Sequence, residues 1–248
     1  MDLPPFWDIV LVVSGAVVAG FVNGLSGTGY ALVSLGFWLH AMPPVVAAPL
    51  AACCAVTSHI TSLRAIWNGV SWPRLWPFLA GGLAGVPIGT ALLTKVHVQP
   101  LKLGVGLLLI IYCSWMAFVR RPPIVTGGGR IADAAIGLTG GIMGGMASIS
   151  GPAPTIWAQL RGWDMHQQRG VSQPFNMTIL MVSFTSALVA GYIDRTFLIW
   201  VALAVPSTLL GARVGVSLYG RINGWQFRRI VLTLLGISGV TLVMSGFR

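Results

Sequence analysis

Hydrophobic residues run along this chain in long blocks that almost lack charge, and the blocks are much longer than buried β-strands. A helix needs about 20 such residues to cross a bilayer. To within a few residues, the blocks are 7–40, 45–67, 75–94, 101–119, 131–160, 170–190, 197–219 and 227–247. The pattern predicts an all-α, polytopic membrane protein that lies in the lipid bilayer.

The first block is too long for one helical span and too short for two. It contains the stretch Gly24-Leu25-Ser26-Gly27-Thr28-Gly29, although a glycine costs roughly 1 kcal/mol relative to alanine inside a helix. We therefore expect two short half-helices that meet at a glycine-rich break inside the membrane, as a re-entrant hairpin. Non-helical backbone persists at that depth only where it is packed in protein or lines a polar cavity. The break is thus a candidate binding site.

The chain contains the same pattern twice: one hydrophobic block with a break, followed by three unbroken blocks. Gly24 aligns with Gly145 and Thr57 with Thr178, an offset of 121 residues. The chain then divides into a first membrane repeat over residues 1–119, a basic linker over 120–130 and a second repeat over 131–248. Three spans plus a hairpin make an odd number of crossings, so we expect the two repeats to be inverted. Inverted repeats are common in secondary transporters, where the substrate site lies at the repeat interface.

The charge balance bears on topology. The chain has 15 Lys and Arg against 5 Asp and Glu, and in a membrane protein such an excess sets orientation rather than indicating a nucleic-acid partner. If each broken block crosses the membrane, the bases divide eight to seven between the two sides; if each is re-entrant, they divide eleven to four. The uneven division favours hairpins, with the basic side in the cytoplasm and both termini outside.

The acidic residues all fall at segment ends or in loops: Asp2, Asp8, Asp133, Asp164 and Asp194. A carrier of metal ions or other cations normally keeps a carboxylate inside the membrane. The pattern therefore favours an anion as the transported species. We expect no cofactor and no metal site.

Several features together carry a family resemblance: the glycine-rich break, the sequence Met42-Pro43-Pro44, a Ser/Thr-rich second helix, the basic linker, and a second copy that ends in Ser150-Gly151-Pro152-Ala153-Pro154. They resemble the TauE/SafE sulfite exporter family, from about Val18 to Met244. The resemblance implies a transporter of sulfite, an organosulfonate or another sulfur oxyanion in a bacterial-type inner membrane. The sequence departs from the usual family pattern at Tyr30, Ser148 and Ser150, where glycine is commoner, and this leaves the particular anion open.

A half-helix that starts just after a break presents unpaired N–H groups and the positive end of its dipole, and it binds anions without a charged side chain. We expect such starts at Thr28-Gly29-Tyr30 and at Ser150-Gly151-Pro152. Arg64 is a candidate for gating or for electrostatic attraction of the anion, or else a snorkelling interfacial residue. The candidate substrate-binding residues are Ser26, Gly27, Thr28, Gly29, Thr57, His59, Ser148, Ser150, Gly151, Gln173 and Asn176. The alternative role for the small residues among them is close helix packing.

Three alternatives to a carrier remain: a passive anion channel, a membrane subunit without transport activity, and an intramembrane serine protease. The protease hypothesis pairs Ser26, in a Gly-x-Ser-Gly motif, with His59 as its base. Against it, the second repeat places Ala147 opposite Ser26 and no histidine opposite His59, although it keeps the break. The sequence leaves open the anion, the direction of transport, the coupling ion and the oligomeric state, for which a homo-oligomer is one alternative.

Overall fold

The computed structural model describes residues 5–66, 69–93, 95, 98–118, 124–218 and a few positions between 233 and 244. In chain order, its helices are α1 (Phe6–Ser26), α2 (Tyr30–Trp38), α3 (Pro44–Ile66), α4 (Trp72–Leu93), α5 (Val98–Phe118), α6 (Gly129–Ala147), α7 (Pro152–Leu160), α8 (Met165–Val189) and α9 (Arg195–Leu218). The described residues include no β-strand, so the all-α prediction is confirmed. The predicted last block, 227–247, lies almost entirely outside the described residues.

Four of these helices are long and apolar enough to cross a membrane: α1, α3, α4 and α9. In α5 a shorter apolar stretch covers Leu103–Trp115, and α8 carries polar residues on its buried face. Large apolar side chains face outward, among them Ile131 at 85% exposure and Val189 at 84%. A surface of this kind suits lipid rather than water.

The two breaks fall close to where the sequence predicts them. Gly27 and Gly29 take left-handed backbone angles, with φ of 72° and 92°, and α2 begins at Tyr30. In the second half Ser148 has φ of 57°, and α7 begins at Pro152. The prediction of two short half-helices is wrong for the first limb of each pair, because α1 has 21 residues and α6 has 19, against nine each in α2 and α7.

Both short helices fold back along the helix that precedes them. The indole Nε1 of Trp38, near the end of α2, donates to the carbonyl oxygen of Val12 in α1 at 3.1 Å. Gly15 of α1 makes room for this ring, since a Cβ at that position would lie 2.8 Å from the same nitrogen. In the second half, Trp157 of α7 donates to Asp133 near the start of α6 at 2.7 Å. Each break therefore lies at the tip of an antiparallel helical hairpin.

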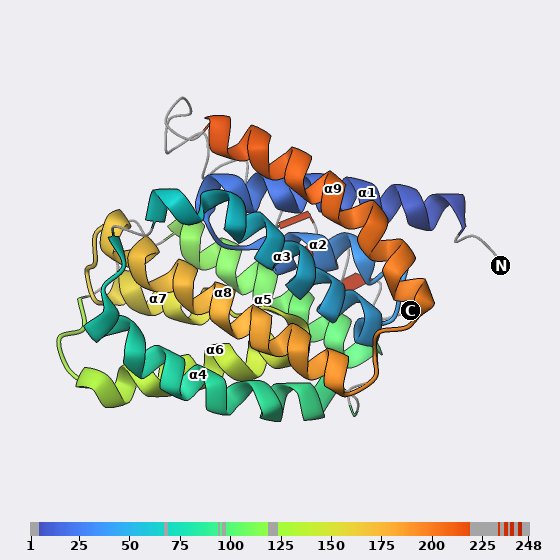
Figure 1. Ribbon diagram of the computed structural model, residues 1–248. Coiled ribbons are helices and arrows are strands. Elements are labelled where there is room, and N and C mark those ends of the chain that lie inside the picture. The colour runs from blue at the N-terminus through green and yellow to red at the C-terminus, as the bar shows by residue number, and fades with distance from the viewer. Residues whose placement is uncertain are drawn as a thin grey trace.

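The long limb of each hairpin packs on a helix from the other half of the chain. A Cβ on Gly141 of α6 would collide with the carbonyl oxygen of Gly82 in α4, and one on Gly24 of α1 would collide with that of Ala212 in α9. Both pairs run parallel, and they lie on opposite sides of α3 and α8 (Figure 1). Small residues four apart allow such close approach; the glycines concerned are Gly20 and Gly24, Gly211 and Gly215, Gly81, Gly85 and Gly89, and Gly137, Gly141 and Gly145.

This packing predicts opposite effects for the same substitution at two helical glycines. Gly141→Ala should lower the melting temperature, because overpacking against a backbone carbonyl costs typically 1–3 kcal/mol. Gly104→Ala in α5 should leave stability unchanged or raise it, because no atom lies within 4 Å of the new Cβ and alanine gains about 1 kcal/mol in helix propensity. Thermal unfolding in detergent measures both. Equal shifts in the two variants would show that the α4–α6 contact is looser than described.

Candidate functional site

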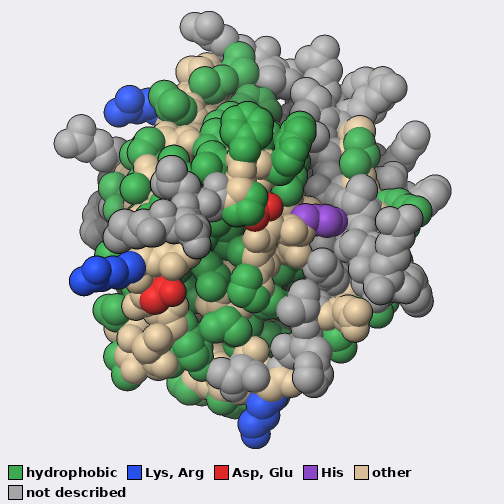
Figure 2. All heavy atoms as spheres, turned by 90° about the vertical axis from the view of Figure 1, so that its right-hand side faces the viewer, with side chains coloured by type: hydrophobic (Ala, Val, Ile, Leu, Met, Phe, Trp, Pro, Cys, Tyr) green, Lys and Arg blue, Asp and Glu red, His purple; other side chains and the backbone are tan. Residues whose placement is uncertain are grey.

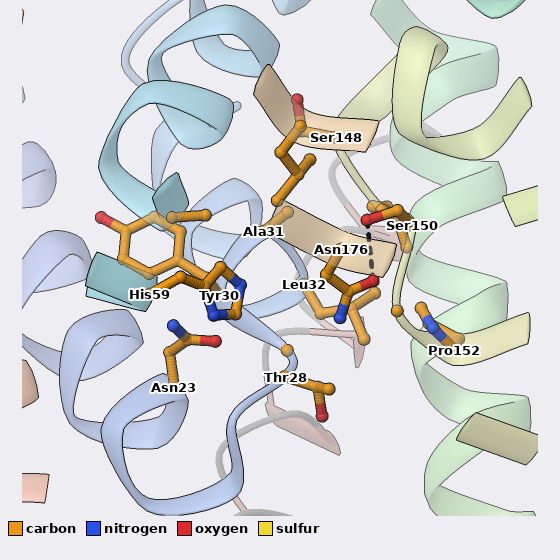
Figure 3. A pocket seen from close by; sticks show the side chains of 15 residues that line it. Asn23, Thr28, Tyr30, Ala31, Leu32, His59, Ser148, Ser150, Pro152 and Asn176 are labelled. Carbon is orange, nitrogen blue, oxygen red and sulfur yellow. Dashed lines mark hydrogen bonds between the residues drawn. The ribbon is translucent and has the colours of Figure 1, made fainter. Parts of the chain in front are cut away.

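A small polar cavity lies where the two hairpin tips meet (Figure 3). Its volume is about 20 Å³, only slightly more than a single water molecule needs. It is lined by residues from both breaks and from α1, α3 and α8, namely Asn23, Thr28, Gly29, Tyr30, Ala31, Leu32, Ala55, His59, Ser148, Ile149, Ser150, Gly151, Pro152, Asn176 and Leu180. Of the residues predicted from the sequence, the structure thus brings together Thr28, Gly29, His59, Ser148, Ser150, Gly151 and Asn176.

The cavity lies far from both ends of the long helices α3 and α8. Asn23 of α1 donates to Ser58 of α3 at 2.9 Å. At 1.5 Å per residue, Ser58 lies about 21 Å from Pro44 and about 12 Å from Ile66, the two ends of α3. By the same arithmetic, Asn176 lies about 17 Å and 20 Å from the ends of α8. The cavity therefore lies at a depth along α3 and α8 where a membrane would have no water.

The first turn of α2 lies at the wall of the cavity. Tyr30, Ala31 and Leu32 all line it, and the N–H groups of a first helical turn have no partner inside the helix. The positive end of the helix dipole lies at the same place. The start of α7 offers less, because Pro152 and Pro154 carry no N–H group. The two half-helix starts predicted to act alike are therefore unequal as anion sites.

The two serines of the second break already use their hydroxyl protons. Ser148 donates to the carbonyl oxygen of Ala48 in α3 at 2.6 Å, and Ser150 donates to Oδ1 of Asn176 in α8 at 3.0 Å. Since a hydroxyl has one proton to donate, neither serine can also donate to an anion while these bonds persist. The bond from Ser150 fixes the amide of Asn176 so that its nitrogen points toward the cavity (Figure 3).

Asn23 lines the cavity but is not among the residues singled out from the sequence. Its side chain is buried, and within the described part of the structure its Oδ1 has no hydrogen-bond partner, whereas Nδ2 is held by Ser58. His59, also buried, lies beside it on α3. The reasoning that large polar groups inside a membrane face a cavity, which selects His59 and Asn176, would have selected Asn23 as well.

The remaining predicted site residues lie elsewhere or are not described. Gln173 packs over the first break, where a Cβ on Gly27 would lie 2.7 Å from its Cδ. Neither polar atom of its buried amide has a partner among the described residues. Thr57 donates to the carbonyl oxygen of Cys54 on its own helix at 2.8 Å, the common structural role of a membrane threonine. The side chains of Ser26 and Arg64 lie outside the described part, and so does any Ser26–His59 pair.

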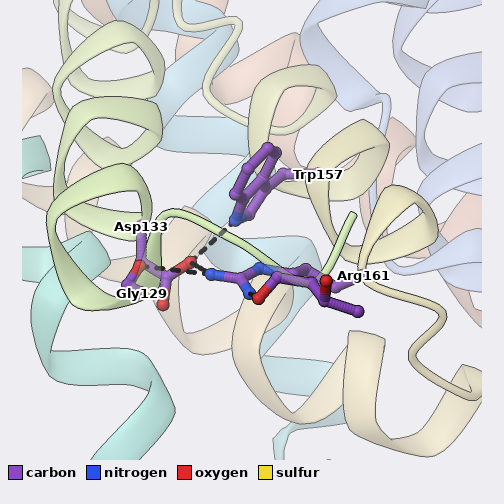
Figure 4. A network of polar contacts seen from close by, with 5 residues as sticks. Gly129, Asp133, Trp157 and Arg161 are labelled. Carbon is purple, nitrogen blue, oxygen red and sulfur yellow. Dashed lines mark hydrogen bonds and ion pairs between the residues drawn. The ribbon is translucent and has the colours of Figure 1, made fainter. Parts of the chain in front are cut away.

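A polar network closes the open end of the second hairpin (Figure 4). Arg161, just after α7, forms an ion pair with Asp133 of α6 at 3.3 Å and donates to the carbonyl oxygen of Gly129 at 3.2 Å. Its guanidinium also lies 5.0 Å from the ring centroid of Trp157. Asp133 is therefore bound to structural partners, and no acid and no Lys or Arg is among the described residues that line the cavity.

A model of the family described as "Sulfite exporter TauE/SafE" matches residues 12–242 of the chain. The chain belongs to the TauE/SafE family. This confirms the resemblance seen in the sequence and makes the protein a member of a family of membrane transporters. No curated protein and no solved structure matches it.

Tyr30, Ser148 and Ser150, the positions where the sequence comparison with the family leads us to expect a departure from glycine, share one structural feature. Tyr30 pairs with Thr208 of α9 at 2.6 Å, and Ser148 and Ser150 bond to α3 and α8 as described above. Each of the three side chains therefore ties a break to a neighbouring helix through a buried hydrogen bond. These bonds fix the geometry of the hairpin tips.

Proposed function

We propose that this protein is a carrier that exports a small sulfur oxyanion, such as sulfite or an organosulfonate, and binds it between the two hairpin tips. The cavity carries the proposal. It combines the N-terminal turn of α2 with the amide of Asn176, and its described lining contains no carboxylate that would repel an anion. Membership of the TauE/SafE family supports transport as the activity. Nothing described favours the channel, the inactive subunit or the protease.

For the architecture we propose two inverted repeats with re-entrant hairpins, over residues 1–119 and 131–248. The helix packing supports this architecture, because α1 of the first half packs on α9 of the second, just as α6 of the second half packs on α4 of the first.

Basic side chains also gather at one end of the molecule. Arg74 lies 5.3 Å from the ring of Trp163, between α7 and α8, and Arg161 donates to the linker carbonyl of Thr126. On the opposite end, where α1 begins, the described side chains are largely hydrophobic, with a few Lys or Arg side chains well separated from one another (Figure 2). We place the basic end in the cytoplasm of a cell with an inner membrane of bacterial type.

Cysteine labelling tests this topology. In a variant without the native cysteines, Pro5→Cys and His40→Cys should both react with a membrane-impermeant maleimide added outside intact cells. These positions flank the first hairpin and are exposed. Arg130→Cys, at the start of α6, should react only after permeabilisation. Labelling of positions 5 and 40 from opposite sides would rule out a re-entrant hairpin.

Ligand-induced stabilisation tests the function directly. We expect sulfite or a sulfonate to raise the melting temperature of the purified protein, since a ligand at 100 times its Kd stabilises by about 2.7 kcal/mol. Asn176→Leu should remove the effect, because it deletes both the amide donor and the partner of Ser150. If no sulfur oxyanion shifts the wild-type protein, the proposed function is wrong. Flux into proteoliposomes then separates a carrier from an inactive subunit, and its turnover rate separates a carrier from a channel.

A further inference from the structure

We propose that the cavity selects an oxyanion that carries a single negative charge and keeps one proton, such as hydrogensulfite, and that Asn23 is the residue that recognises the proton. The inference rests on the proposed function and narrows its substrate class. It follows from two observations: the cavity is built from uncharged donors, and one buried acceptor is turned into it.

The uncharged lining sets the preferred charge of the ligand. Among the described lining residues the titratable side chains are His59 from α3 and Tyr30 from α2; α1, α8 and the second break contribute none. The energy that an ion gains from neutral dipoles rises in proportion to its charge, whereas the free energy of removing it from water rises with the square of the charge. Doubling the charge therefore doubles the binding energy but quadruples the desolvation cost, so a cavity of neutral dipoles discriminates against a dianion.

The acceptor is Oδ1 of Asn23. The bond from Nδ2 to Ser58 holds the amide so that Oδ1 turns toward the cavity, beneath the His59 ring (Figure 3). It is buried and has no partner among the described residues, and a buried acceptor left unpaired is costly. A fully deprotonated oxyanion offers only lone pairs and would repel this oxygen. An anion with an O–H group satisfies it.

The opposite wall of the cavity has the complementary polarity. Asn176 points its amide nitrogen inward because its oxygen accepts from Ser150, and the first turn of α2 adds backbone donors. An oxyanion can thus place its charged oxygens toward Asn176 and α2 and its hydroxyl toward Asn23. The small volume, about 20 Å³, favours an inorganic anion over one with an organic tail.

Calorimetric binding to the purified protein tests the charge class. Methanesulfonate is a monoanion and sulfate a dianion at every working pH, so we expect measurable affinity for the first and none for the second. Sulfite should bind more tightly than methanesulfonate at acidic pH, and its apparent affinity should fall as pH rises and hydrogensulfite loses its proton. This fall in sulfite affinity with pH should persist in His59→Gln, because the proton that is lost belongs to the anion.

Two outcomes would overturn the inference while leaving anion binding intact: sulfate affinity equal to that of methanesulfonate, or sulfite affinity that rises with pH. Absence of binding by every anion would overturn the proposed function itself.

A pair of variants tests the role of Asn23. Asn23→Leu keeps the branched shape of the side chain and removes the acceptor. It should weaken sulfite binding at acidic pH about tenfold, the equivalent of about 1.4 kcal/mol. Binding of methanesulfonate, which has no proton to offer, should change little. Ser58→Ala is the comparison variant: it keeps Oδ1 and removes only the bond that orients it, so it should weaken sulfite binding less than Asn23→Leu does. If both variants weaken both anions equally, Asn23 has only a structural role and the proposal fails.

Discussion

Gly27→Val should abolish anion transport while leaving membrane insertion intact. The backbone of Gly27 has φ of 72°, a conformation that a β-branched residue adopts only with strain of about 1–3 kcal/mol. The new Cβ would also lie 2.7 Å from Cδ of Gln173, which is a buried residue of α8. Relief of this clash requires the first hairpin tip to shift, and with it the first turn of α2 that supplies the donors. Flux in proteoliposomes and ligand-induced stabilisation both measure the loss.

Two further variants separate the effect of backbone strain on transport from the effect of the steric clash with Gln173. Gly29 has φ of 92°, but the one described atom near a Cβ there is Cγ1 of Val22, at 3.8 Å. Gly29→Ala therefore carries the strain without a clash and should lose less activity than Gly27→Ala. Gln173→Ala removes the side chain that Gly27→Ala would strike, so the double variant should recover part of the lost flux. Wild-type flux in Gly27→Val would mean that the first break does not form the site.

The starts of α2 and α7 could be predicted from the sequence, because their signals are local. Glycine marks the first break, and the Ser-Gly-Pro sequence marks the second. The lengths of the limbs could not, since Gly24 and Gly145 have the same composition signal as Gly27 but lie within long helices, where they permit contact with α9 and α4. The packing glycines differ from the glycines of the break in their spacing of four residues to Gly20 and Gly141. The sequence shows this spacing, but it does not show which helix the glycines contact.

The roles of individual polar side chains depended on partners far away in the chain. Ser148 is a plausible anion donor from the sequence, but in the structure its hydroxyl donates to the carbonyl oxygen of Ala48, 100 residues earlier. Asn176 is a site residue both in the sequence prediction and in the structure, but only the bond from Ser150 shows which end of its amide faces the cavity. The orientation of Asn23 likewise depends on Ser58. Sequence reasoning selects the residue types of such a site; tertiary packing decides which of their atoms remain available.

Efflux of the anion should be driven by membrane voltage alone, without a pH gradient. An anion that leaves a negative interior moves downhill by about 2.3 kcal/mol per charge per 100 mV. For a monoanion, 100 mV therefore sustains a concentration ratio of about fiftyfold, since 1.4 kcal/mol is a factor of ten. Hydrogensulfite meets this condition, because it keeps a net charge of one although it carries a proton. No acidic side chain lines the described cavity to bind a coupling cation, and His59 is the lining residue whose type titrates near neutral pH.

The measurement is efflux from proteoliposomes at a clamped potassium diffusion potential, with the internal pH held constant and the external pH varied. We expect the rate to follow the voltage and to remain when the two pH values are equal. His59→Gln should keep at least part of this flux, because an amide can still donate a hydrogen bond to an oxyanion. If efflux stops whenever the pH gradient is removed at fixed voltage, uniport is wrong. Loss of that dependence in His59→Gln would then identify His59 as the proton-coupling residue, whereas its persistence would assign the coupling to the proton on the anion.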